Sequence, residues 1–265
     1  MSSGQTKKTA LITGASGGIG KAFAELLAND GYDLILVARS GDELNRIAGM
    51  EMTKNETTTI VLPMDLAVVG AVDNLVADLK QRAIVPDIII NNAGIGLVGE
   101  TAKLPVEKQL AIIDLNIKAL TEITLRFLPQ MIERGTGGII NVSSVAAFMP
   151  GPYMSVYYAS KAYVQSFSDG LANELRNTKI KVMTLCPGPV DTGFQANADM
   201  DTKRVLYKMM GPKTADEVAL DGWAGFKSGN TVVVPGIMNL LTVWSAKFMP
   251  KALMMPIIRL FQKPK

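Results

Sequence analysis

Seven short apolar runs, separated by helix-length segments, constrain the fold of this chain more than any other feature. Each run is nearly continuous in apolar, β-branched residues, as strands covered on both faces of a parallel sheet must be. The runs are Thr9–Thr13, Asp33–Ala38, Thr58–Leu62, Asp87–Asn91, Gly138–Val142, Lys181–Leu185 and Thr231–Val234. Helical patterns span Ile19–Asn29, Asp42–Thr53, Ala71–Arg82, Val106–Glu133, Tyr157–Arg176 and Ala215–Lys227. This alternation predicts an α/β fold with a doubly wound, seven-stranded parallel sheet and helices on both faces.

A glycine-rich turn follows the first predicted strand. It reads Gly14-Ala15-Ser16-Gly17-Gly18-Ile19-Gly20 and leads into the first predicted helix. Glycines let the backbone turn tightly and approach a ligand closely, and a helix N-terminus offers unpaired N–H groups to a pyrophosphate. The spacing Gly-x-x-x-Gly-x-Gly is one residue longer than the common dinucleotide fingerprint. We predict a dinucleotide cradle here, against the alternative of a turn that binds nothing.

The end of the second predicted strand indicates the type of dinucleotide. An acidic residue about 20 positions beyond the glycines would hold the ribose 2′-hydroxyl of NAD. The stretch here is Leu36-Val37-Ala38-Arg39-Ser40, which has an arginine and no carboxylate. A guanidinium pairs with a phosphate in bidentate fashion. We therefore predict NADP as the cofactor, with NADPH preferred over NADH, unless Arg39 is merely a solvated surface residue.

The absence of histidine limits the chemistry. It excludes histidine-based catalytic triads and histidine-ligated metal centres, and we expect no metal. Tyr157 and Lys161, four residues apart, share one face of a predicted helix. To act as an acid or base near neutrality, a tyrosine must lose roughly three pKa units, or ~4 kcal/mol. A lysine ammonium about 4 Å away supplies ~4 kcal/mol at an effective dielectric of ~20. An exposed helix face is the alternative interpretation.

With these two motifs, the chain resembles the short-chain dehydrogenase/reductase family, in its shorter single-domain branch. The resemblance covers about residues 7–234: Thr13-Gly14-x-x-x-Gly18-x-Gly20 matches the cofactor motif, Tyr157-x-x-x-Lys161 the catalytic motif, and Asn91-Asn92-Ala93-Gly94 the segment beside the adenosine ribose. It implies a Rossmann-type fold. It also implies hydride transfer between a nicotinamide cofactor and a carbonyl or alcohol.

The resemblance implies four catalytic residues. Tyr157 would exchange the proton, Lys161 would lower the tyrosine pKa and hold the ribose, and Asn116 would connect Lys161 to solvent through water. The family's catalytic serine lies thirteen residues before the tyrosine, which selects Ser144 (157 − 144 = 13) and leaves Ser143 as its structural neighbour.

The resemblance also implies a set of cofactor contacts. Asp65 would hold the adenine ring, and Thr192 would hold the nicotinamide carboxamide. The cofactor-binding residues implied are Gly14, Ser16, Gly17, Gly18, Ile19, Gly20, Arg39, Ser40, Asp65, Leu66, Asn92, Ala93, Gly94, Tyr157, Lys161, Pro187, Gly188, Val190 and Thr192.

Apolar residues around these motifs indicate the substrate. Leu97 and Met154 are expected at the substrate entrance, and Phe194 with residues 200–210 in a substrate lid. We predict an apolar ketoacyl, ketosteroid-like or other ketone or aldehyde substrate. The alternatives are an NADP(H)-binding regulator with little turnover, and an epimerase or dehydratase.

The organisation of the chain is expected to be simple. We predict one dinucleotide-binding domain over residues 1–265, with a core of about 7–235 and a C-terminal extension over 236–265. The N-terminus lacks a signal-like apolar stretch, which favours a cytoplasmic location. A net charge of +3 is too small to suggest a nucleic-acid partner. A homodimer or homotetramer is expected.

The extension, where apolar and basic residues alternate, could contact a membrane surface, cover the active site or pack on a second subunit.

Overall fold

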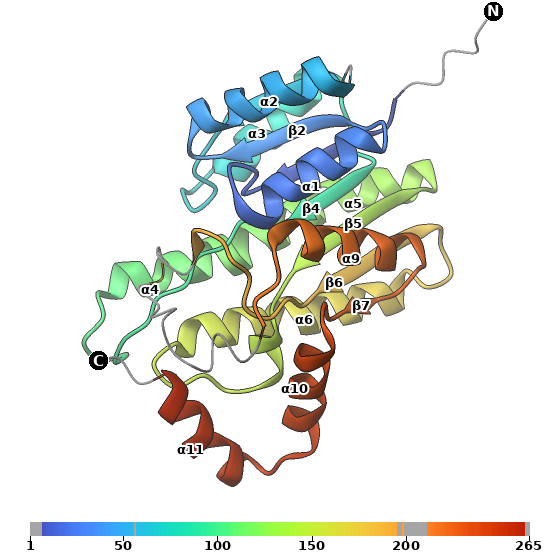
Figure 1. Cartoon of the computed structure of the whole chain (residues 1–265). Helices are drawn as coiled ribbons and strands as arrows, with labels where there is room; N and C mark the ends of the chain where they lie inside the picture. The colour runs from blue at the N-terminus through green and yellow to red at the C-terminus, as the bar shows by residue number, and fades with distance from the viewer. Residues whose placement is uncertain (1–6, 56, 195–197, 199–210, 263–265) are drawn as a thin grey trace, which may run out of the picture.

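The computed structural model describes residues 7–55, 57–194, 198 and 211–262 (Figure 1). In this part of the chain, seven parallel strands form one sheet in the order β3-β2-β1-β4-β5-β6-β7. The strands are β1 (Thr9–Thr13), β2 (Asp33–Ala38), β3 (Thr59–Pro63), β4 (Ile88–Asn91), β5 (Gly137–Val142), β6 (Ile180–Leu185) and β7 (Val232–Val233). The predicted Rossmann-type, doubly wound sheet is confirmed.

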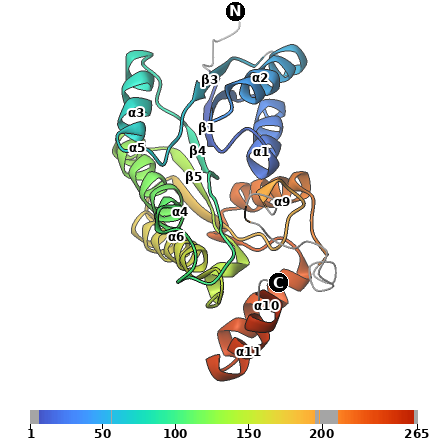
Figure 2. The same ribbon diagram turned by 90° about the vertical axis from the view of Figure 1, so that its left-hand side faces the viewer.

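Helices cover both faces of the sheet (Figure 2). One layer contains α1 (Gly18–Asn29), α2 (Gly41–Asn55) and α9 (Ala215–Lys227); the other contains α3 (Ala71–Gln81), α5 (Leu120–Arg134) and α6 (Ser155–Glu174). A buried apolar cluster fills each interface, around Phe23 and Trp223 on the first face and around Leu75 and Phe127 on the second. Burial of strands from both sides explains their continuous apolar character.

The long helix predicted over 106–133 is interrupted. It divides into α4 (Val106–Ile113), a π-helical turn (Asp114–Ala119) and α5. A π turn accommodates one more residue than an α turn, and it occurs frequently at functional sites. Here it carries the buried side chain of Asn116.

The sheet topology brings the sequence motifs together at one edge. β1 pairs with β2 on one side and with β4 on the other, so the strand order reverses between β1 and β4. Ligands bind in open α/β sheets outside the carboxyl ends of the strands, at such a reversal. The glycine-rich turn after β1 and the Asn92 segment after β4 both lie there.

Two helices, α10 (Ile237–Phe248) and α11 (Lys251–Gln262), follow the last strand. They extend away from the layered body in both views (Figures 1 and 2). Asn239 and Val243 bury the side of α10 that faces the body. None of the helices in the described ranges combines the length and the apolar character that crossing a bilayer requires.

Candidate active site

The glycine-rich turn is a tight backbone loop between β1 and α1. Gly14 and Gly18 adopt positive φ angles of +65° and +52°, which L side chains rarely adopt. A Cβ on Gly20 would lie 2.3 Å from the carbonyl oxygen of Gly14, so only glycine fits that position. A Cβ on Gly17, by contrast, would meet nothing within 4 Å. The backbone at Gly17 therefore faces open space.

The N-terminus of α1 has the properties that an anion requires. Gly17 is its N-cap, no side chain caps the helix, and no acidic residue occurs in its first turn. The first N–H groups of the helix and its dipole are thus available to a phosphate. A dinucleotide pyrophosphate fits this turn. Ser16 lies half-buried within it, and Ile19 anchors α1 to the core.

The ends of β2 and β3 lie beside this turn. The amide of Ala15 donates to Val37 O at 3.3 Å, and the amide of Met64 donates to Ala38 O at 2.8 Å. Arg39 and Ser40, directly after β2, are exposed. After β3, the exposed Asp65 accepts a hydrogen bond from the amide of Ala67 at 3.0 Å, and Leu66 is buried. These residues form the edge where the adenosine half of a dinucleotide would lie.

Asn92 fastens the glycine-rich turn to β4. Its amide Nδ2 donates to Thr13 O at 3.0 Å and to Gly14 O at 3.2 Å. The Thr13 hydroxyl accepts from the backbone amides of Asn92 and Ala93, at 3.0 Å each. Gly94 follows, and a Cβ there would lie 3.3 Å from Asn116 Oδ1 and 3.4 Å from Lys161 Nζ. The cofactor motif and the catalytic motif are therefore neighbours at Gly94.

The two serines after β5 have different environments. Ser143 is buried and donates to Lys161 O at 2.8 Å, which ties β5 to α6. Ser144 is partly buried, accepts from the Ala146 amide at 3.1 Å and lies 3.4 Å from Pro187 O. The neighbouring Ser144 hydroxyl also acts on Tyr157, because it lowers the pKa of that phenol. The structure thus brings together Ser144 and Tyr157, the pair that the thirteen-residue spacing selects.

Asn116, Ser160 and Tyr157 are joined in one chain of hydrogen bonds. Asn116 Nδ2 donates to the Ser160 hydroxyl at 3.0 Å, and that hydroxyl donates to Tyr157 O at 2.7 Å. Asn116 also exchanges hydrogen bonds with the backbone of Ile95, at 2.9 and 3.0 Å. The π-helical turn therefore fixes the start of α6 and the strand end that leads to the pocket.

The ionisation of the tyrosine–lysine pair differs from the sequence-based expectation. Burial raises the pKa of Tyr157 above its ordinary value, more than the hydrogen bond with Ser144 lowers it. Lys161 Nζ donates to Val142 O at 2.9 Å and lies 5.8 Å from the centre of the Tyr157 ring. Burial lowers the pKa of Lys161 to about 8. The predicted depression of the tyrosine pKa by Lys161 is wrong for the chain alone, because desolvation of the phenolate has the largest effect on that pKa.

The segment after β6 reaches back to the glycine-rich turn. Val190 is buried and bridges to Lys213. A Cβ on Gly18 would lie 2.9 Å from Thr192 Cγ2, so Thr192 directly abuts the turn. Gly188 packs against the side chain of Asn239, because a Cβ there would lie 2.1 Å from Asn239 Oδ1. The extension thus contacts the candidate nicotinamide segment.

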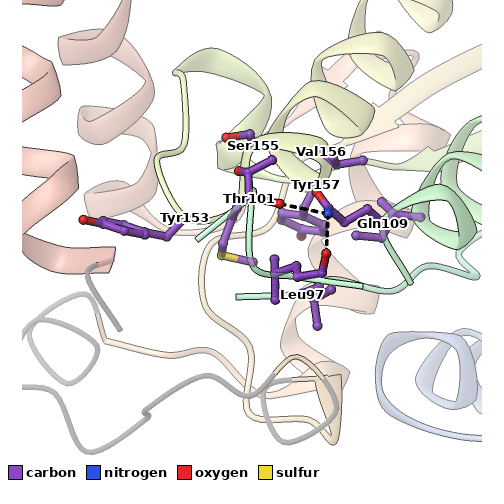
Figure 3. Close-up of a pocket in the computed structure, with 10 residues that line it drawn as sticks. Leu97, Thr101, Gln109, Tyr153, Ser155, Val156 and Tyr157 are labelled. Atoms are coloured by element: carbon purple, nitrogen blue, oxygen red, sulfur yellow. Dashed lines mark hydrogen bonds between the residues drawn. The ribbon is translucent and has the colours of Figure 1, made fainter. Parts of the chain in front are cut away.

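A narrow, partly open pocket adjoins Tyr157 (Figure 3). Leu97 and Met154 line it, as the sequence predicts for the substrate entrance. Gln109 on α4 closes one side, where its amide donates to Thr101 O and Leu104 O at 3.1 Å each. The centre of the Phe194 ring lies 5.5 Å from that of the Tyr157 ring. Residues 200–210, which were predicted to belong to a substrate lid, lie outside the described residues.

Sequence reasoning missed three residues of this region: Ser160, Gln109 and Asn239. Ser160 stands inside the Tyr157-x-x-x-Lys161 motif, three residues after the tyrosine, so its position on the same helical face was the available signal. Gln109 and Asn239 reach the site only through tertiary packing. In the described part of the chain, no three acidic or cysteine side chains gather as metal ligands.

A family comparison matches most of the chain. The sequence model described as short chain dehydrogenase matches residues 8–203. An uncharacterized oxidoreductase of Staphylococcus saprophyticus is 33% identical over 213 residues, which make up 80% of this chain and 89% of the relative.

Solved structures resemble the whole fold. A short-chain dehydrogenase from Sphingobium yanoikuyae in complex with NADPH is 31% identical with a TM-score of 0.82, and the match covers 97% of this chain and 99% of that one. A short-chain dehydrogenase/reductase from Burkholderia phymatum in complex with NAD is 25% identical with a TM-score of 0.79, and the match covers 98% and 96%. Both nicotinamide dinucleotides thus occur among structural relatives.

Proposed function

Because the chain belongs to the short-chain dehydrogenase family, we propose that it is an NADPH-dependent oxidoreductase acting on a carbonyl or alcohol group of an apolar substrate. A nicotinamide-dependent oxidoreductase follows from the family. The observation that carries the catalytic proposal is the position of Tyr157 next to Lys161. The Lys161 Nζ lies 5.8 Å from the centre of the tyrosine ring and adjoins Gly94, at the same sheet edge as the glycine-rich turn.

The cofactor residues are proposed from their position along that edge. Gly14 to Gly20 would take the pyrophosphate, Asp65 and Leu66 the adenine, and Asn92 to Gly94 the adenosine ribose. Pro187, Gly188, Val190 and Thr192 would border the nicotinamide. When bound, the reduced nicotinamide supplies the hydride that the protein itself cannot provide.

The chain's own residues would handle the proton. In reduction, the Tyr157 hydroxyl donates a proton to the carbonyl oxygen as negative charge develops there. Ser144 donates a hydrogen bond to the same oxygen, which stabilises the developing alkoxide. Lys161 restores the tyrosine proton and Asn116 positions the start of α6. A cationic oxidised nicotinamide beside Tyr157 would favour the phenolate and offset part of the burial that raises the tyrosine pKa.

The preference for NADPH is proposed from Arg39. This residue is exposed directly after β2, the position from which side chains contact the 2′ substituent of the adenosine ribose. A guanidinium there favours a 2′-phosphate. The NADPH complex of the Sphingobium relative supports this assignment, whereas the NAD complex of the Burkholderia relative makes cofactor choice a matter for direct measurement.

An apolar substrate is proposed from the lining of the pocket. Leu97, Ile112 and Met154 present apolar side chains around Tyr157. Apolar walls with a few placed polar groups are typical of small-molecule sites. A ketoacyl chain, a ketosteroid-like ring or another ketone or aldehyde would satisfy this lining.

A homodimer or homotetramer is proposed from exposed apolar side chains on the helices of one face. Val106 and Leu110 on α4, and Leu125 and Ile132 on α5, are each at least half exposed. Apolar patches of this kind mark association sites. The single-domain organisation and the cytoplasmic location stay predictions.

A second candidate is an NADP(H)-binding regulator with little turnover. The raised pKa of Tyr157 and its burial favour it, because a less acidic, buried phenol donates its proton more slowly. A panel of ketones and aldehydes, followed by the absorbance of NADPH, separates the two. Turnover that Tyr157→Phe abolishes supports the enzyme, whereas tight NADPH binding with no turnover on any substrate supports the regulator.

A further inference from the structure

Helix α10 exposes its most apolar face. Its inward side carries the buried Asn239 and Val243. On the opposite side, five large apolar residues form the α10 stripe, and each of them is more than half exposed. The α10 stripe consists of Ile237, Leu240, Leu241, Trp244 and Phe248. At 100° per residue, these positions fall within one third of the helix circumference.

Aromatic residues occupy the middle and end of the α10 stripe. Trp244 is 65% exposed and Phe248 70% exposed, with their ring centres 4.8 Å apart. A surface helix of a globular protein normally directs such residues inward. On α11, Leu253 is also exposed, at 63%. The apolar surface therefore continues past Phe248 onto the second helix.

The charges around this surface have a single sign. Residues 237–265 contain no aspartate or glutamate, and their basic residues are Lys247, Lys251, Arg259, Lys263 and Lys265. Lys247 and Arg259 are exposed, and the Lys247 ammonium lies over the ring of Phe148, 5.7 Å from its centre. Apolar and aromatic residues flanked only by cations are the combination that binds an anionic lipid surface.

We propose that α10 and α11 attach the protein peripherally to anionic membranes. The α10 stripe would enter the boundary between headgroups and acyl chains, where Trp is favoured, while Lys247 and Arg259 contact lipid phosphates. Both helices extend from the body in Figures 1 and 2, so the stripe can meet a flat surface without obstruction by the sheet layers.

Charge decides between this partner and a second copy of the chain. Two α10–α11 surfaces facing each other would bring Lys247 and Arg259 of both copies together, four like charges, with no carboxylate from either segment to pair them. An anionic bilayer instead supplies the opposite charge. The predicted alternative in which the extension only covers the active site leaves the α10 stripe unexplained, because that stripe faces away from the body.

The test is sedimentation of the full-length protein with vesicles of phosphatidylcholine, alone or mixed with phosphatidylglycerol. We expect binding to the mixed vesicles that weakens as salt rises. Trp244→Ser/Phe248→Ser should reduce the partition coefficient at least tenfold. Lys247→Gln/Arg259→Gln should reduce it by roughly thirtyfold. Leu220→Ser, which changes a residue 58% exposed on α9, is the matched control and should bind as the wild type does.

Further measurements keep the outcome unambiguous. Trp223 is buried, so a blue shift of tryptophan emission on vesicle binding would report Trp244. Absence of sedimentation with the mixed vesicles, or binding unaffected by Trp244→Ser/Phe248→Ser, would overturn the proposal. So would a smaller oligomer of that variant in light scattering, because the α10 stripe would then be a contact between subunits. NADPH binding and thermal unfolding verify that each variant is folded.

Discussion

The side chain of Asn116 donates a hydrogen bond to the hydroxyl of Ser160 across 3.0 Å, and both residues are buried. Asn116→Ala removes this bond together with two bonds to Ile95. Ser160→Ala removes this bond together with the one to Tyr157 O and leaves the Ile95 bonds in place. A buried hydrogen bond contributes ~1 kcal/mol. We expect Ser160→Ala to lower the unfolding free energy by about 2 kcal/mol and Asn116→Ala by about 3 kcal/mol. Urea denaturation measures both, and equal losses would contradict the network.

Replacement of the tyrosine tests the proton donor directly. Tyr157→Phe removes the hydroxyl and keeps the ring that packs on Phe194. We expect kcat to fall at least ~100-fold, the usual contribution of general acid–base catalysis, with little change in NADPH affinity. Steady-state kinetics and a binding titration measure these two quantities. Turnover close to that of the wild type would remove Tyr157 from the mechanism.

Substitution of Arg39 tests cofactor choice. Arg39→Leu should lower kcat/KM for NADPH by ~10–100-fold, because a charge-assisted bond to phosphate contributes ~1.5–3 kcal/mol. The value for NADH should change little, since NADH has no 2′-phosphate. Leu220→Ser, remote from this edge, serves as the control. Equal efficiency of the wild type with both cofactors would refute the assignment before any variant is made.

Substitution of two glycines of the turn should affect different properties, stability in one case and cofactor binding in the other. A Cβ at Gly20 would collide with Gly14 O, so Gly20→Ala should destabilise the fold by ~2 kcal/mol or more. Gly17 has an extended φ of −178° and open space around it, so Gly17→Ala should leave the melting temperature unchanged. It should nevertheless weaken NADPH binding, because the new methyl group occupies the phosphate approach. Calorimetry of both variants, with and without NADPH, measures these effects.

Because the pKa of Lys161 is lowered in the folded chain, we expect the unfolding free energy to depend on pH in the alkaline range. Its pKa is lowered to about 8 in the folded chain from an ordinary 10.5, so the unfolded chain binds more protons between these values. The unfolding free energy should therefore rise between pH 8 and pH 9, by about 1 kcal/mol. From pH 9 upward Cys186 has the opposite effect, because burial raises its pKa to about 12. Lys161→Met should flatten this rise while abolishing turnover. Urea denaturation across this pH range measures it, and an identical slope in the variant would assign the effect to another group.

Local patterns predicted the frame of the molecule well. The bounds of β1, β2 and α9 agree with the expectation, because strand periodicity, the glycine-rich turn and the Thr214–Glu217 capping box are all encoded by neighbouring residues. The doubly wound parallel sheet followed from βαβ alternation and the family resemblance, whereas the strand order came from the structure. The position of Ser144 beside Tyr157 agrees with the prediction made from the thirteen residues that separate the two in sequence.

Features that depend on tertiary packing could not be predicted. Apolar periodicity over 106–133 does not reveal the additional residue of the π turn, so the helix seemed continuous in sequence. The raised pKa of Tyr157 depends on burial of its ring, which a Tyr-x-x-x-Lys spacing does not specify. Helices α10 and α11 were not predicted from the sequence, because the large apolar residues of α10 face outward and not toward a core.

The contact between Gly188 and Asn239 ties the C-terminal extension to the interior of the site. Asn239 Nδ2 also donates to Pro235 O at 2.7 Å, which anchors the first turn of α10. Deleting the extension would therefore leave a void against the loop after β6 and loosen that loop. Truncated chains would confuse a damaged catalytic centre with lost attachment, so the extension must be studied by changing single outward residues.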